Sequence, residues 1–186
     1  MHILPTQKDA ASNLGRFKVN TALSIMDTLA EHLDRLRRRL VATSRHVNGA
    51  RVLMAAIYGV GPMTSLALCA WLGGPDRFSS SRKAVRFTGL DITVHSSDSK
   101  RSPGRLSRQG PEVLRWLLFE AAKTSARSCA PGYRYYTDVK ARYDANRAAL
   151  SQARRIVRHA VHLLADLGEE AFTITAQPAS PTTVAR

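Results

Sequence analysis

The segment between Gly89 and Gly110 combines hydroxyl groups with cations, and chemistry on a phosphate needs both. A serine hydroxyl can attack a phosphodiester and hold the broken strand as a phosphoserine, so that rejoining needs no ATP. The reaction requires an exposed serine, cations around the phosphate and a nearby proton acceptor. The candidate nucleophiles are Ser96, Ser97, Ser99 and Ser102, and the candidate phosphate clamps are Lys100, Arg101, Arg105 and Arg108.

The same segment also allows other interpretations. Arginine suits phosphate because its planar fork makes two parallel hydrogen bonds. His95, next to two of the serines, could accept a proton or make a weak phosphate contact. A basic, serine-rich loop can equally be solvated and inert. Composition alone therefore leaves catalysis, simple phosphate binding and a solvated loop as alternatives.

The charge of the whole chain points to a polyanionic partner. Its 186 residues include 28 Lys and Arg against 14 Asp and Glu, a net charge of +14. A basic excess of this size favours nucleic acid, with a membrane surface or a merely solvated basic face as alternatives. No run approaches the roughly 18 apolar residues of a membrane span. Without a signal-like start or a cysteine motif around Cys69 and Cys129, we expect a cytoplasmic protein.

An amphipathic helix is predicted over residues 21–44 because apolar residues recur there at steps of three and four. They are Leu23, Met26, Leu29, Leu33, Leu36 and Leu40. This helix either packs on its own domain or forms a seam with a partner chain. We expect a poorly structured N-terminus over 1–20 and a helical arm over 21–48.

Residues 51–74 predict two apolar helices joined by Gly59-Val60-Gly61-Pro62. This pattern is typical of a helix-hairpin-helix, in which Gly59 and Gly61 would let backbone N–H groups approach a nucleic-acid phosphate. Such contacts position a nucleic acid without specifying its sequence. The alternative is a plain helical hairpin with a glycine turn.

The rest of the chain predicts a mainly α fold with one helical domain over 49–172. Short helices are expected at 82–88 and after Pro111, a long one at 147–167, a short strand at 91–94 and a disordered tail at 173–186. The tyrosines of 130–144 either stack on bases or cap the core. His159 and His162 share a helix face but lack an acid or cysteine beside them, so no metal site is expected.

Short motifs follow one another along the chain from the glycine turn onward. They are Gly59-Val60-Gly61-Pro62, Thr64 to Ala70, Asp76-Arg77-Phe78, Phe87-Thr88-Gly89-Leu90, Gly104 to Gly110, Leu114-Arg115 and Tyr135-Tyr136. This ordered set resembles the C-terminal domain of transposases of the insertion sequence 110/116/902 family, whose recombinases are guided by a bridge RNA. The resemblance runs from the glycine turn to about Glu170. The helix at 21–44 is similar to the helical arm that precedes this domain in the family.

The resemblance implies DNA transposition or site-specific recombination through a catalytic serine. That serine falls on Ser97, with Ser96 as second choice, and the glycine that follows it in the family is Asp98 here. The implied partners are DNA, a guide RNA and a second copy of the chain. A non-catalytic nucleic-acid-binding module and a helical assembly module are the alternatives.

The resemblance also implies a second domain that residues 1–20 cannot supply. Family members begin with a RuvC-like domain whose acidic residues bind divalent metal, so Mg²⁺ is expected only with that domain. We therefore expect this chain to carry no metal ligands, to be inactive alone, and to be a truncated, partial or split form of the protein.

Overall fold

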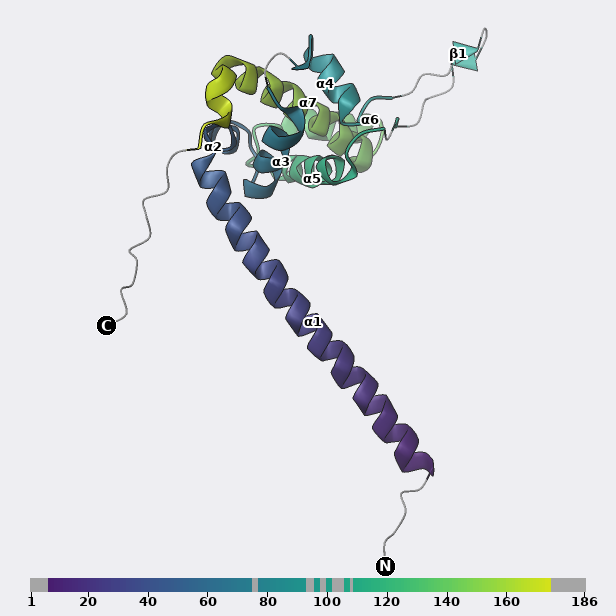
Figure 1. Ribbon diagram of the computed structural model, residues 1–186. Coiled ribbons are helices and arrows are strands. Elements are labelled where there is room, and N and C mark those ends of the chain that lie inside the picture. Colours follow the sequence, from purple (N-terminus) through teal and green to yellow (C-terminus); the bar gives the residue numbers. More distant parts are fainter. Residues whose placement is uncertain are drawn as a thin grey trace, which may run out of the picture. The chain divides into compact units, whose positions relative to one another are not determined.

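The computed structural model describes residues 7–74, 77–92, 96–97, 100–101, 106–107 and 109–174. This part of the chain is mainly helical, as the sequence predicts (Figure 1). It divides into two compact units, the first ending at Arg39 and the second beginning at Leu40. The helices are α1 (Gln7–His46), α2 (Asn48–Ala56), α3 (Pro62–Leu72), α4 (Ser81–Phe87), α5 (Glu112–Lys123), the 3₁₀ helix η2 (Thr124–Ala126), α6 (Tyr133–Arg142), α7 (Ala145–Leu167) and the 3₁₀ helix η3 (Gly168–Phe172).

Helix α1 begins earlier than the sequence analysis predicts. The expectation of poor structure over 1–20 is wrong for residues 7–20, which are helical. This stretch lacks apolar periodicity, but it contains good helix formers such as Ala10, Ala11 and Leu14. Helix elongation is far more favourable than nucleation, so a long helix extends readily through such residues.

The first unit carries an apolar heptad stripe along α1. In this stripe, steps of three and four alternate, which is the pattern of a coiled-coil seam. Its members in the first unit are Val19, Ala22, Met26, Leu29, Leu33 and Leu36. The large ones among them are 55–65% exposed. A lone helix has no second layer against which to bury such a stripe.

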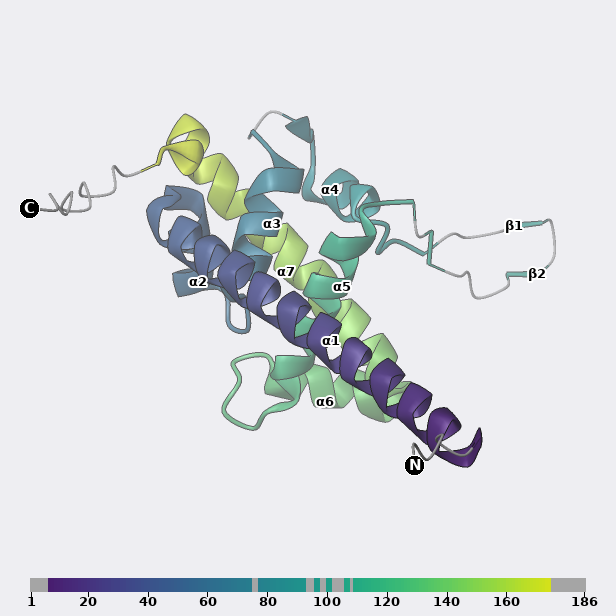
Figure 2. The same ribbon diagram turned by 60° about the horizontal axis from the view of Figure 1, so that its bottom comes forward.

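The second unit is organised around α7, which contacts α4, α5 and α6 (Figure 2). The inward face of α7 is rich in alanine, and small side chains allow neighbouring helices to come close. Leucines from the surrounding helices fill the remaining core. The fully buried alanines of α7 are Ala148, Ala149, Ala153 and Ala160, and the buried leucines include Leu53, Leu68, Leu114 and Leu118.

Specific residues set the ends of the helices in this unit. The Ser80 side chain caps α4, and the carboxylate of Asp144 accepts a hydrogen bond from the backbone nitrogen of Arg147 (2.8 Å) at the start of α7. Gly168, with φ of +58°, ends α7 where the sequence predicts. Cys69 belongs to the core, and burial raises the pKa of its thiol to about 11.

The strand content of the described residues is small. Two short strands, β1 (Ser96–Ser97) and β2 (Lys100–Arg101), pair antiparallel. Of the strand predicted at 91–94, Ile92 forms a single bridge with Leu106, and residues 93–95 lie outside the described part. Ile174 pairs with Val47, whereas the rest of the predicted disordered tail, 175–186, also lies outside it.

The turn between α2 and α3 requires glycine at position 59. Gly59 has φ of +84°, a conformation that costs other residues about 1–2 kcal/mol. A Cβ there would also lie 2.7 Å from the carbonyl oxygen of Ala121 and collide with the Thr124 side chain. The α2–α3 turn is therefore packed directly against the end of α5.

This packing predicts a difference between two glycine substitutions. Gly59→Ala should lower the free energy of unfolding by about 1–3 kcal/mol more than Gly168→Ala, because overpacking adds to the backbone strain. Gly168 is the matched control, since its φ is positive but no neighbour lies within 4 Å of the point where a Cβ would be. Urea unfolding followed by circular dichroism measures both, and equal losses would contradict the packing argument.

Candidate nucleic-acid interface

The backbones on the two sides of the serine segment approach each other at a pair of glycines. Gly89 has φ of +69°, and a Cβ there would lie 2.9 Å from the backbone nitrogen of Gly110. A Cβ on Gly110 would collide with the backbone of Phe87 and Thr88. Glycine at both positions thus brings together the ends of residues 90–109, which we call the serine excursion.

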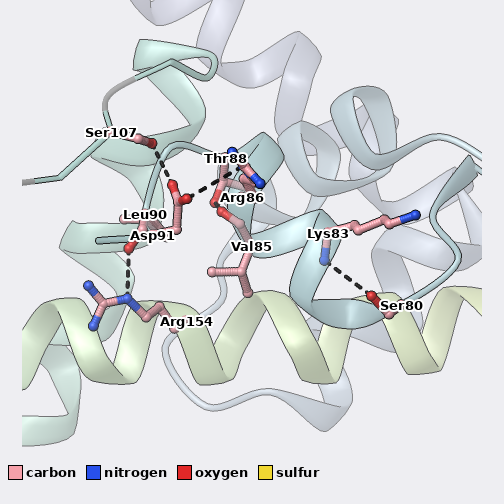
Figure 3. Close-up of polar contacts among 9 residues, drawn as sticks. All are labelled: Ser80, Lys83, Val85, Arg86, Thr88, Leu90, Asp91, Ser107 and Arg154. Atoms are coloured by element: carbon pink, nitrogen blue, oxygen red, sulfur yellow. Dashed lines mark hydrogen bonds and ion pairs between the residues drawn. The ribbon is translucent and has the colours of Figure 1, made fainter. Parts of the chain in front are cut away.

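A carboxylate holds the two flanks of the excursion next to these glycines (Figure 3). The Ser107 hydroxyl donates to Oδ1 of Asp91 (2.5 Å), and the Ser107 amide donates to the Asp91 carbonyl (3.1 Å). On its other side, Oδ2 of Asp91 lies 3.8 Å from Nε of Arg86 in α4. Together with the glycine pair and the Ile92–Leu106 bridge, these contacts form what we call the foot of the excursion.

The foot is also attached to the central helix. Nε of Arg154, on α7, donates to the carbonyl of Leu90 (2.7 Å), as Figure 3 shows. Burial, and secondly the charge of Arg158, lower the pKa of the Arg154 guanidinium. The excursion therefore leaves the helical core from a base held by α4, by α7 and by its own returning flank at Leu106 and Ser107.

The strand register pairs two of the predicted site residues with two others. Ser97 stands opposite Lys100, and Ser96 stands opposite Arg101. These two candidate nucleophiles thus have the backbone of a candidate phosphate clamp as their cross-strand neighbour. Asp98, Arg105 and Arg108 lie outside the described residues, as do His95, Ser99 and Ser102.

The two predicted phosphate-binding glycines differ in their surroundings. The need for glycine at position 59 is explained by its packing against Ala121 and Thr124. Gly61 precedes the first residue of α3, and no neighbour lies within 4 Å of the point where its Cβ would be. Of the two, Gly61 offers the space for a phosphate to approach the amino end of α3.

A basic–aromatic stripe on α6, α7 and the residues between them was not assigned as a site from the sequence. The Arg155 guanidinium lies 4.4 Å from the ring centroid of Tyr135, and the Arg147 guanidinium lies 5.5 Å from that of Tyr143. Tyr135 also hydrogen-bonds the Ser151 hydroxyl (2.5 Å). The stripe consists of Tyr135, Tyr143, Arg147, Arg154, Arg155 and Arg158.

The tyrosines of this region differ in their surroundings. Tyr136 is buried in the core, whereas Tyr135 and Tyr143 are exposed and contact arginines. The sequence indicates this stripe in two ways: tyrosine recurs before α7, and arginine recurs along α7. Arginine stacked on an exposed tyrosine provides a charge for phosphate and a flat face for a base.

Comparison with known proteins identifies the segment that carries the foot and the excursion. Residues 51–137, from α2 to α6, match the model of the transposase IS116/IS110/IS902 family. This segment belongs to that transposase family. The chain is also similar to a probable family 20 transposase of Pseudomonas aeruginosa, with 33% identity over 107 residues. A transposase for insertion sequence element IS1111A of Coxiella burnetii is 36% identical over 72 residues.

The similarity covers different shares of the proteins compared. It includes 56% of this chain and 31% of the Pseudomonas aeruginosa transposase. For the Coxiella burnetii transposase the shares are 39% and 20%. The chain thus matches less than a third of the length of either transposase.

Among the residues that the structure describes, no group of three or more His, Cys, Asp and Glu side chains is placed to hold a metal ion. His159 and His162 accordingly have no such partners among the described residues. In the same residues, no helix combines the length and the apolar character needed to cross a bilayer.

From the contacts of the foot we expect Asp91 to control the local stability of the serine excursion. Asp91→Ala removes a hydrogen bond to a charged acceptor, which is worth about 1.5–3 kcal/mol. Hydrogen exchange at the Ser107 amide should therefore become about tenfold faster or more. Asp138→Ala is the matched control, since it removes an exposed carboxylate from α6. Similar exchange rates in the two variants would show that the carboxylate does not hold the foot.

Proposed function

We propose that this chain is the DNA-binding, serine-bearing domain of an insertion-sequence transposase, acting in DNA transposition through a phosphoserine intermediate. The observation that carries the proposal is the hairpin register, in which Ser97 stands opposite Lys100 inside a segment of this transposase family. Ser96, opposite Arg101, is the second choice. The net charge of +14 supports nucleic acid as the partner.

The proposed reaction conserves the energy of the phosphodiester bond, because one ester bond to phosphorus is exchanged for another. The Ser97 hydroxyl gives its proton to a base while its oxygen forms a bond to phosphorus. The bond between phosphorus and the leaving strand breaks, and the leaving oxygen takes a proton. Attack by the hydroxyl of another strand end then reverses these steps, releasing serine and joining DNA without ATP.

Cations stabilise the charge that develops on the phosphate during these steps. We assign this role to the four predicted clamps, Lys100, Arg101, Arg105 and Arg108. Asp98 places a negative charge next to Ser97 in the sequence, and the cations have to offset it.

Binding of the nucleic-acid backbone is proposed for two other places in the same unit. The amino end of α3 at Gly61 can receive a phosphate, and the basic–aromatic stripe adds arginines along α7. The guide RNA implied by the family would be a further polyanionic partner. The Mg²⁺ implied by the family would be held by the acidic residues of a RuvC-like domain, and the described residues of this chain do not present a fitting set of ligands.

A covalent protein–DNA adduct tests the proposal. The chain is incubated with a RuvC-like domain in trans, Mg²⁺, guide RNA and element-end DNA, and adducts are separated by denaturing electrophoresis. We expect an adduct that disappears in Ser97→Ala and persists in Ser99→Ala, because only the first removes the nucleophile. Binding by both variants should fall steeply with salt, by about 0.9 in log affinity per phosphate contact for each unit of log salt.

Two outcomes would redirect the assignment. An adduct that survives Ser97→Ala and disappears in Ser96→Ala would move the nucleophile by one residue. Salt-sensitive binding without any adduct would favour the alternative of a non-catalytic nucleic-acid-binding module.

A second candidate function, assembly with another copy of the chain, is favoured by the heptad stripe of α1. Leu23 and Ile25 widen the apolar surface beside the stripe, whereas Lys18, His32, Arg37 and Arg39 flank it elsewhere. Pairing with the stripe of a second copy would bury this apolar surface in a coiled-coil seam.

The assembly proposal predicts a substitution that separates the chains. Leu33→Glu places a carboxylate in the stripe and should shift the dimer–monomer equilibrium toward monomer by at least about tenfold. Ser24→Glu adds the same group on the opposite face and should leave the equilibrium unchanged. Sedimentation equilibrium measures both, and a wild-type chain that is monomeric at all concentrations would exclude assembly through α1.

A further inference from the structure

A cavity of about 350 Å³ lies between the foot of the excursion and the basic–aromatic stripe. Its volume is in the range of about 300–1,000 Å³ that is usual for small-molecule sites. Ile92 and Leu106, the bridged pair of the foot, form one side. Tyr143, which follows α6, and Arg147, Leu150 and Arg154 of α7 are also in its lining.

The lining of this cavity combines an apolar surface with one aromatic ring and two cations. Tyr143 is 64% exposed, so part of its ring surface is available to a ligand. The Arg147 guanidinium lies 5.5 Å from the centroid of this ring. The bond from Arg154 to the Leu90 carbonyl fixes a second guanidinium at the cavity.

We infer that this cavity receives one unpaired nucleobase of the bound DNA, with an adjoining phosphate on Arg147 or Arg154. A base is flat and largely apolar on its faces, so it stacks on tyrosine and arginine side chains. It is also always attached to phosphate, which explains the presence of two cations beside an apolar surface. An aliphatic side chain of a protein partner would use the apolar surface alone.

This inference rests on the proposed function, because it specifies how the same domain holds its nucleic acid. Ile92 and Leu106 line the cavity and also form part of the foot that carries the serine hairpin. A base held between them and Tyr143 would attach the strand to the support of the candidate nucleophile. The cavity would thereby favour DNA with a nucleotide already out of the stack.

The test compares two DNA duplexes that differ in one nucleotide. One carries a single unpaired 2-aminopurine, and the other is fully paired. The whole chain should bind the first about tenfold more tightly at the same salt concentration, as expected for one base–aromatic stack. Binding should also quench the 2-aminopurine fluorescence.

Two variants assign the preference to the cavity. Tyr143→Leu removes the ring but keeps an apolar side chain, and Tyr143→Ala removes the ring together with most of the apolar side chain. Both should reduce the tenfold preference to near equality while retaining salt-sensitive binding of paired DNA. Tyr133→Leu, at an exposed tyrosine outside the cavity, is the matched control and should retain the preference. Circular dichroism establishes that each variant is folded.

The outcomes separate this inference from the proposed function. Equal binding of both duplexes by the wild-type chain, with a steep salt dependence, would overturn the inference and leave DNA binding intact. Loss of the preference in Tyr133→Leu as well as Tyr143→Leu would overturn it too. Failure to bind either duplex would count against the proposed function itself, and the inference would fall with it.

Discussion

The close approach of two backbones at Gly89 and Gly110 is the constraint on which the candidate site depends. A side chain at Gly110 would collide with the end of α4, so the chain could not return to the point from which the excursion leaves. Asp91 and Ser107 add a polar contact directly beyond this closure. The serine hairpin therefore starts from a defined base, although it extends from an otherwise helical domain.

Helix α7 links this base to the remaining parts of the interface. Its alanine face lies in the core, while its arginines contact exposed tyrosines and the Leu90 carbonyl. One rigid element thus carries both the packing surface and the cations. The cavity, the stripe and the foot share this helix, so a nucleic acid bound along it would be held close to the support of the hairpin.

The helices of the second unit could be predicted from the sequence because their signals are local. Apolar periodicity, the Ser80 and Asp144 caps and the glycine at 168 determine where they begin and end. The foot could not be predicted in this way, since Asp91 and Ser107 meet only after the intervening chain has folded back. Gly59 was assigned to phosphate contact, but the structure also gives it a packing role that depends on α5. The start of α1 was missed because helix elongation needs no apolar pattern.

Because the foot closes the excursion at its base, folding of the helical core depends little on which residues make up the segment beyond the foot. Once the two flanks are joined, the closure entropy of the loop grows only slowly, by about 0.6 kcal/mol for each doubling of its length. Insertions or exchanges between the flanks would therefore disturb the core little. The hairpin can be regarded as an interchangeable cassette, in which new nucleophile and cation arrangements can arise without a new fold to support them.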